Sequence, residues 1–316
     1  MTKHRLAFLL LIISNIIFAQ NNLDKTIYLD SLWKETSKEN CKYYRIVKDY
    51  YNDKEIYRFE DYYKNGTLQM EGYSKAKDAL ISEGEFTYYY ENGNKKSTQS
   101  YIKGRPSGLS YTWYENGNKK SELEYITQKN NELLYDIKTN QYWGKDNTQS
   151  VIDGNGYIDE KEGKLQEKGS IKNGWKEGEW KGTDSQFKIS FTENYKNGKL
   201  KNGTSIDSLM VKRKYNEVFN YPRPKRGLQH FYSYVAKNFK IPGNKEDISG
   251  KIILTFIINK DGSTDKIKIA KSLDEVLDAE AVELIRGYPE WESGQYRGIG
   301  AKVEYSIPIK IVSGRK

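Results

Sequence analysis

An aromatic segment that ends in Asn-Gly recurs along much of this chain. The clearest copies are residues 62–66 (YYKNG), 89–93 (YYENG) and 113–117 (WYENG), and weaker copies contain the Asn-Gly pairs at 173–174 and 197–198. Asn and Gly both tolerate positive φ, so each copy predicts a β-hairpin closed by a tight turn. Because a single hairpin is marginally stable in water, neighbouring copies must stack. The repeats therefore predict an elongated, single-layer β-sheet.

Composition favours a β-rich chain of two modules over one large core. The chain has 316 residues, a length typical of two domains. Hydrophobic residues make up 36% of the chain and the mean hydropathy is −0.87, yet tyrosine occurs 27 times. A tyrosine buries its ring while its hydroxyl stays in water, which suits thin, solvated sheets.

A different pattern occupies the end of the chain. The apolar run 250–258 (GKIILTFII) precedes Asp261-Gly262, which predicts a buried strand followed by a turn. Residues 272–275 (SLDE) predict a capping box that starts a helix, and Gly287 predicts a left-handed helix end. An earlier helix is predicted from the apolar stripe beside His230. The last strand is predicted to bury one face, made of Ala301, Val303, Tyr305, Ile307, Ile309 and Ile311.

The order helix, strand, strand, helix, strand resembles the C-terminal domain of TonB, the energy transducer of the Gram-negative envelope. The resemblance covers residues 228–311 and implies an α+β domain with a small antiparallel sheet and two helices. For Trp291 we expect packing in the core. The positions that match the family pattern, and that we expect to be structural, are Gly250, Asp261, Gly262, Ala281, Pro289, Trp291 and Gly298.

The same resemblance implies a binding edge. In the TonB family, the exposed edge strand captures an extended peptide from an outer-membrane transporter by pairing backbone amides with it. Pro308 favours an edge position for the last strand, because proline cannot donate to an interior ladder. Homodimerisation stays open beside this role. The expected partner-binding strand consists of Lys302, Val303, Glu304, Tyr305, Ser306, Ile307, Pro308, Ile309 and Lys310.

The upstream repeats resemble MORN repeats in the form found in bacterial YwqK-like proteins. Two uses stay open: a spacer or scaffold, and peptide or glycan binding through exposed Tyr and Trp. For the whole chain, the alternative is a secreted structural or ligand-binding repeat protein whose C-terminal domain serves dimerisation or capping. The expected modules are a signal peptide or short anchor (1–20), a lead-in segment (21–42), a first repeat set (43–126), degenerate repeats (127–205), a basic Pro-containing linker (206–227) and the TonB-like domain (228–316).

The first residues predict export. Lys3 and Arg5 precede a short apolar stretch that ends at Ala19, which is the pattern of a secretory signal peptide. The stretch is short for a membrane span, and an uncleaved inner-membrane anchor is the alternative. The expected location is the periplasm or cell envelope, which excludes nucleic acid as a partner. A working TonB also has a Pro-rich spacer, whereas this chain has 6 prolines, so energy coupling for transmembrane transport stays open.

The chain carries a net charge of +9, and basic residues flank the predicted junction between its modules. We expect either a solvated linker or an attraction to anionic lipid headgroups at the membrane surface. The residues concerned are Lys212, Arg213, Lys214, Arg223, Lys225 and Arg226.

Residue types that support catalysis or metal binding are sparse. One cysteine, Cys41, and two histidines assemble no Ser-His, Cys-His or His-rich metal site. Residues 153–159 (DGNGYID) resemble the start of a calcium loop. However, Tyr157, Ile158 and Lys164 stand where an oxygen ligand, a glycine and a glutamate are needed, so a tight turn is expected. The sequence predicts a non-enzyme with no catalytic residue, cofactor or metal.

Overall fold

The computed structural model describes residues 23–128, 131–243, 247–288 and 291–312. It divides the chain into two compact units, residues 1–137 with 143–148 and residues 138–142 with 149–316. The predicted signal peptide or anchor (1–20) and Pro289 lie outside the described residues. Among the described residues, no helix is long and apolar enough to cross a membrane.

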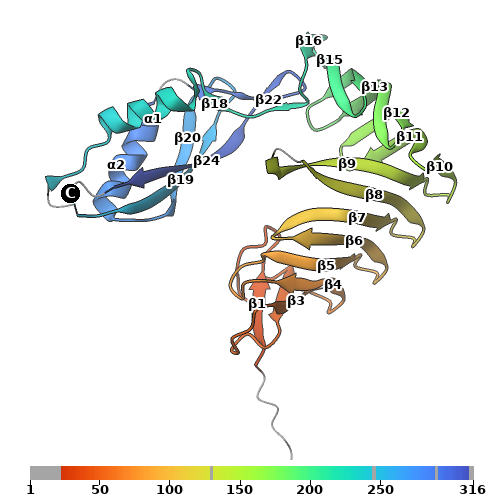
Figure 1. Cartoon of the computed structure of the whole chain (residues 1–316), viewed down its shortest axis with the longest axis horizontal. Helices are drawn as coiled ribbons and strands as arrows, with labels where there is room; N and C mark the ends of the chain where they lie inside the picture. Colours follow the sequence, from red (N-terminus) through yellow and green to blue (C-terminus); the bar gives the residue numbers. More distant parts are fainter. Residues whose placement is uncertain (1–22, 129–130, 244–246, 289–290, 313–316) are drawn as a thin grey trace, which may run out of the picture. The chain divides into compact units, whose positions relative to one another are not determined.

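The first unit is built of antiparallel strands, each beside the next in sequence (Figure 1). Strand β9 (Asn131–Trp143) has residues in both units. The sheet begins before residue 43, inside the segment expected to be a lead-in. The strands of the first unit are β1 (Lys25–Leu29), β2 (Tyr43–Val47), β3 (Tyr57–Tyr63), β4 (Leu68–Ser74), β5 (Ser82–Tyr89), β6 (Lys95–Ile102), β7 (Arg105–Trp113) and β8 (Lys119–Gln128).

The Asn-Gly turns of the first unit differ from the prediction in one respect. Only the glycine takes positive φ, as at Gly93 (+85°) and Gly117 (+89°). The asparagine side chain instead accepts a hydrogen bond from the backbone two residues later, as Asn92 Oδ1 does from the N–H of Asn94 at 2.9 Å. These are longer loops in which a glycine ends a type I turn. In the second unit, both Asn173 and Gly174 have positive φ, as predicted.

Tyrosine hydroxyls connect successive hairpins of the first unit. In each of the three clear copies, the tyrosine that precedes the turn donates to a backbone carbonyl of a later strand, 23 to 29 residues further along the chain. This shared bond explains why the aromatic residue and the turn recur together, because it satisfies a carbonyl and ties one hairpin to the next. The three bonds are Tyr63 Oη to Tyr89 O (2.9 Å), Tyr90 Oη to Trp113 O (2.9 Å) and Tyr114 Oη to Trp143 O (2.8 Å).

The second unit continues with antiparallel strands in which aromatic rings cover glycines. Trp180 lies opposite Gly169, and Phe191 lies opposite Gly182. A Cβ atom on either glycine would stand 2.3 Å from the facing ring, so the ring occupies the space that a side chain would need. These strands are β10 (Gln149–Ile152), β11 (Asn155–Glu162), β12 (Leu165–Lys172), β13 (Trp175–Asp184), β14 (Ile189–Lys196), β15 (Lys199–Asp207) and β16 (Lys212–Tyr215).

Strand β16 lies within residues 206–227, which were predicted to be a linker, and corrects that prediction. Lys212 to Tyr215 pair with β15 instead of forming an extended connection. Arg223–Pro224 form the short strand β18, which pairs with β21 (Trp291–Glu292). Backbone pairing therefore occupies much of the stretch whose basic and proline residues indicated a linker.

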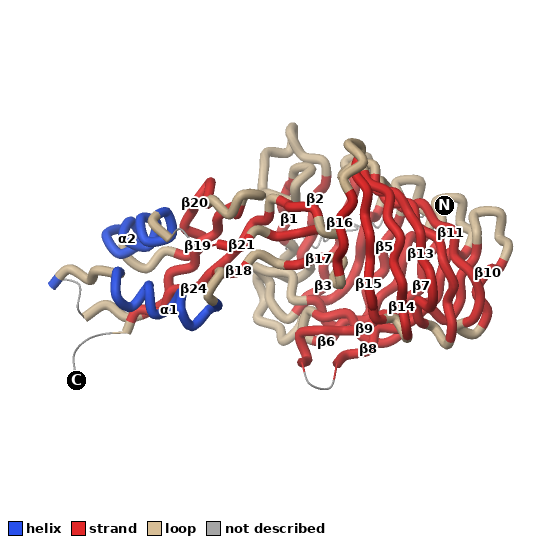
Figure 2. The backbone as a smooth tube through the Cα atoms, turned by 90° about the horizontal axis from the view of Figure 1, so that it is seen from above, coloured by secondary structure: helices blue, strands red, loops and turns tan. Residues whose placement is uncertain are grey.

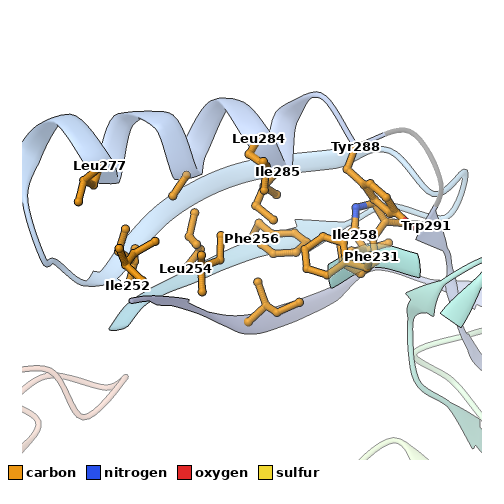
Figure 3. Close-up of a cluster of buried hydrophobic side chains, with 14 residues drawn as sticks. Phe231, Ile252, Leu254, Phe256, Ile258, Leu277, Leu284, Ile285, Tyr288 and Trp291 are labelled. Carbon is orange, nitrogen blue, oxygen red and sulfur yellow. The ribbon is translucent and has the colours of Figure 1, made fainter. Parts of the chain in front are cut away.

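The C-terminal part contains both helices of the described chain, as Figure 2 shows. A sheet of order β20-β19-β24 carries a core that Figure 3 shows in close-up. Together with the strand array, this confirms the predicted fold class. The elements are β17 (Phe219–Asn220), α1 (Gly227–Asn238), β19 (Gly250–Ile258), β20 (Thr264–Lys271), α2 (Glu275–Arg286), β22 (Gly294–Tyr296), β23 (Ile299–Ala301) and β24 (Val303–Ile311).

Two details of helix α2 correct the prediction. The helix starts after Asp274, whose carboxylate accepts from the N–H groups of Val276 and Leu277, so Ser272 is not the cap. Gly287 ends the helix with φ of −81°, which is right-handed. The Asp274 carboxylate also lies at the positive end of the helix dipole, where a serine hydroxyl has no charge to offer.

Candidate docking edge and a buried ion pair

Strand β24 lies at the side of its sheet. It pairs with β19 over nine residues, from Val303 opposite Ile258 to Ile311 opposite Gly250. Among the described strands, none pairs with its other side. A strand in this position presents backbone N–H and C=O groups that an incoming strand can use.

The core holds the inner face of β24. Ile307, Ile309 and Ile311 are buried. Tyr305 packs edge-on against Phe256 and Trp291, with ring centroids 5.8 and 5.4 Å apart. Burial raises the pKa of Tyr305. The apolar side chains thus fix the strand while its other face remains accessible.

The outer face of β24 is exposed and carries Glu304, Ser306, Pro308 and Lys310. Successive residues of a strand direct their N–H and C=O groups to opposite sides. The N–H groups of Glu304, Ser306 and Lys310 therefore share the side of the Pro308 nitrogen, which has no proton to donate. Lys302 precedes the strand and is also exposed.

Gly262 and Trp291 contact each other next to the core that packs under β24. Gly262 has φ of +85°, and a Cβ atom there would stand 2.4 Å from the carbonyl oxygen of Trp291. The Trp291 ring is buried, as expected, and contacts Phe231, Phe256 and Tyr288 at centroid distances of 5.3 to 5.5 Å.

The other described family positions have separate structural roles. Ala281 is buried in the core, and a Cβ atom on Gly250 would meet the side chain of Leu273. Asp261 accepts from the backbone and hydroxyl of Ser263 within the β19–β20 turn, and these hydrogen bonds lower its pKa. Gly298, with φ of +76°, lies against Arg213.

The turn between β22 and β23 inserts Arg297 into the face of the second strand array. Its Nε donates to Glu193 Oε1 at 2.8 Å, and the two side chains are 4% and 0% exposed. The guanidinium lies 3.7 Å from the ring centre of Phe191. Ser205 Oγ donates to the Arg297 carbonyl at 2.7 Å. This turn joins the C-terminal part to strands β14 and β15.

Tyrosines complete the surroundings of this ion pair. The hydroxyls of Tyr215 and Tyr195 donate to the two carboxylate oxygens of Glu193 at 2.7 and 3.0 Å. Burial and the Glu193 charge raise the pKa values of both tyrosines. Burial opposes the charge on Arg297, but Glu193 outweighs this effect and raises the pKa of the guanidinium. The Glu193 carboxylate thus forms an ion pair with Arg297 and accepts hydrogen bonds from two tyrosine hydroxyls.

The structure does not gather the six basic junction residues into one unpaired group. Arg213 pairs with Asp207 at 2.7 Å, and Arg223 pairs with Glu292 at 2.5 Å. Arg226 is the N-cap residue of α1. Lys212, Lys214 and Lys225 are exposed.

The residues of the rejected calcium loop form a tight turn. Asp153 and Gly154 both have positive φ and connect β10 to β11. Throughout the described residues, no group of three or more His, Cys, Asp or Glu side chains is placed to hold a metal ion.

Sequence reasoning missed the pairing of Arg297 with Glu193. Arg297 stands in a turn, where a charged residue is ordinary. The available signal was the alternation Phe191, Glu193, Tyr195, which places a carboxylate on the same face as two aromatic rings. A carboxylate on a buried face requires a partner, although the sequence does not identify it.

Comparisons with known proteins concern the C-terminal part. Residues 244–311 match the family model described as Gram-negative bacterial TonB protein C-terminal. The solution structure of the Helicobacter pylori TonB C-terminal domain matches with 22% identity over 28% of this chain and 96% of that chain, with a TM-score of 0.23. The comparison with curated proteins found no match. The family match confirms the predicted resemblance to the TonB C-terminal domain over residues 244–311, whereas the MORN resemblance stays a prediction.

Proposed function

We propose that this chain, which carries a TonB C-terminal segment, is a cell-envelope interaction protein that receives an extended partner segment at β24. The family match supports an interaction role in general, because the TonB C-terminal family is a non-enzymatic protein-interaction domain. The observation that carries the proposal is the position of β24, whose apolar face is held by the core and whose outer side carries no described strand. The mode of binding is β-augmentation.

The residue pattern of β24 supports selective pairing over aggregation. Pro308 removes one donor from the side that we assign to the partner, and this loss is tolerated at an edge. The exposed charges of Lys302, Glu304 and Lys310 disfavour pairing with an unmatched strand. Strand β24 therefore has free backbone groups for pairing and exposed charges that favour a partner strand of complementary charge.

The proposed partner class is an outer-membrane TonB-dependent transporter, with other envelope proteins as the wider class. The proposed location is the periplasm, reached through cleavage near residue 20. Energy coupling for transport requires a chain anchored in the inner membrane. Sequencing the N-terminus of the mature protein separates the two cases, because an intact Met1 in the inner-membrane fraction supports anchoring.

In this account the repeat strands are a platform. The insertion of Arg297 between Phe191 and Glu193 supports it, because it ties the C-terminal part to the strand array instead of leaving it on a free linker. The same contact favours the second candidate, in which the C-terminal part caps the array of a structural or ligand-binding protein. Dimerisation and lipid contact through Lys212, Lys214 and Lys225 remain further proposals.

The test replaces Ser306 in the full chain. Ser306→Pro removes a backbone donor from the proposed binding side, whereas Ser306→Ala keeps the donor and removes only the hydroxyl. The probe is a synthetic N-terminal peptide of a TonB-dependent transporter from the same bacterium, and calorimetry gives its affinity. We expect the proline variant to bind about tenfold more weakly and the alanine variant to bind as the parent does.

Equal affinity of the proline variant and the parent would show that the peptide uses another surface. A circular dichroism spectrum for each variant checks that the fold is retained. Strong binding of the peptide by a chain that lacks residues 228–316 would favour the repeat strands as the binding site.

A further inference from the structure

Three lysines lie together at one end of the C-terminal sheet, one on each of its strands β20, β19 and β24. Lys251 of β19 and Lys310 of β24 are opposite each other, and Lys271 of β20 lies opposite Ile253. All three lysines are exposed. They line a hollow of about 630 Å³ together with Ser249, Gly250, Ile311 and Val312.

Within the residues that the structure describes, no carboxylate forms an ion pair with the lysines of this hollow. Like charges that are directly opposite in an antiparallel pair destabilise it. Across the residues that the structure describes, Lys251, Lys271 and Lys310 make no ion pair and no side-chain hydrogen bond. Other lysines of the chain do so, as Lys176 does with Glu167 at 2.7 Å. An arrangement that costs stability and faces solvent favours an anionic ligand.

We propose that this lysine hollow binds the carboxylates of an acidic, extended peptide that adds to β24. The inference rests on the proposed function, because strand addition is what brings the peptide to the hollow. Side chains of an added strand lie opposite the exposed residues of β24, about 5 Å away. A residue opposite Lys310 therefore reaches the hollow, where Lys251 and Lys271 add to the attraction.

The charge along β24 specifies the register of the partner. Ser306 and Pro308 are uncharged, and Lys302 and Glu304 at the other end have opposite charges. The uncompensated charge is therefore confined to the Lys310 end. A partner strand with its acidic residues at that end matches this pattern of charge. A flat anionic membrane has no sequence of charges that could align with β24. The partner segment is thus expected to be acidic at one end and neutral in its middle.

The test uses the full chain and two labelled ten-residue peptides of alternating Val and Thr. One peptide has two Thr residues near one end replaced by Glu, and the other has Gln at the same places. Fluorescence anisotropy at low ionic strength gives both affinities. We expect the Glu peptide to bind at least about fivefold more tightly, with the advantage shrinking as salt is added.

The matched variants remove equal charge from two places. K251Q/K271Q/K310Q is expected to abolish the preference for Glu. K196Q/K199Q/K201Q, which removes three exposed lysines from the β14–β15 hairpin, is expected to keep it. The proposed carboxylate site is overturned if the preference for Glu survives K251Q/K271Q/K310Q. It is also overturned if the parent binds both peptides equally, or binds neither.

Backbone N-methylation of the peptides separates this inference from strand addition. If both peptides bind equally and N-methylation abolishes binding, strand addition stands and the hollow is overturned. If binding stays selective for Glu despite N-methylation, the hollow stands as a carboxylate site and strand addition is overturned. Lysine-dependent binding to phosphatidylglycerol vesicles without any peptide preference also overturns the proposal, in favour of a lipid surface.

Discussion

Arg297 and Glu193 form an ion pair of 2.8 Å although 104 residues separate them in the chain. Both side chains are almost fully withdrawn from solvent. Burying two charges is costly unless their geometry is good and the remaining acceptors are satisfied. Here Tyr195 and Tyr215 occupy the other acceptor sites of the carboxylate. The pair between the C-terminal hairpin and the strand array therefore has the geometry and the satisfied acceptors that a buried ion pair requires.

Removal of one partner is expected to be strongly destabilising. Arg297→Met leaves Glu193 buried without its cation, which is expected to lower the free energy of unfolding by about 3–5 kcal/mol. Urea unfolding followed by tryptophan emission measures this loss. The control Arg286→Met removes an exposed pair with Glu283 and is expected to cost at most about 1 kcal/mol.

The double variant R297M/E193L is expected to regain part of that stability, because it leaves no unpaired charge in the interior. If R297M and R286M cost the same, the buried pair does not hold the hairpin in place.

Alkaline pH is expected to weaken the same contact. Burial raises the pKa of Tyr296 to about 12, and its hydrogen bond to Asp184 adds to this effect while Arg297 opposes it. A tyrosine in the unfolded chain has a pKa of about 10, so the native state holds the Tyr296 proton more tightly. The contribution to stability is complete below about pH 10 and is lost as the pH rises through about 12.

Unfolding at a series of pH values between 9 and 12 measures this slope on the parent and on Tyr296→Phe. The phenylalanine variant is expected to show a flatter slope than the parent. Tyr157→Phe, at an exposed position, is the control and is expected to leave the slope unchanged. An identical slope for the parent and Tyr296→Phe would contradict this assignment.

Gly262 is expected to be irreplaceable for two separate reasons. An alanine there meets both the strain of positive φ and the Trp291 carbonyl. Gly227 has a similar φ of +82° with nothing within 4 Å of its Cβ position, so Gly227→Ala carries the strain alone. We expect Gly262→Ala to lose roughly 1–3 kcal/mol more than Gly227→Ala in thermal unfolding. Equal losses would mean that the turn moves away from Trp291.

The tyrosine bonds between hairpins are expected to contribute individually. Tyr63→Phe removes the hydroxyl that donates to the Tyr89 carbonyl and is expected to cost about 1 kcal/mol. Tyr73→Phe changes an exposed tyrosine and is expected to be neutral. Chemical denaturation of both variants tests the difference. A neutral Tyr63→Phe would show that packing of the ring, and not the hydroxyl, maintains the repeat.

Much of this fold was predictable because its elements are defined by local pattern. The alternation from Val303 to Ile311 predicts which face of β24 is buried, and the Asn-Gly pairs predict the positions of hairpins. The sequence could not predict details for which two nearby residues are equally suitable, such as the residue that caps a helix. Ser272 and Asp274 are both good caps, and only the backbone conformation selects Asp274. The pairing of Arg297 with Glu193 depends on how two modules meet, which no local pattern describes.

The assignment of β24 as the docking edge is tested most directly by hydrogen–deuterium exchange across residues 303–311, with and without the transporter peptide. The account predicts that the peptide slows exchange at the amides of Glu304, Ser306 and Lys310. The amides of Tyr305 and Ile307 are expected to be protected already by β19. Unchanged exchange at Glu304, Ser306 and Lys310, with new protection on α1 or on the repeat strands, would contradict it.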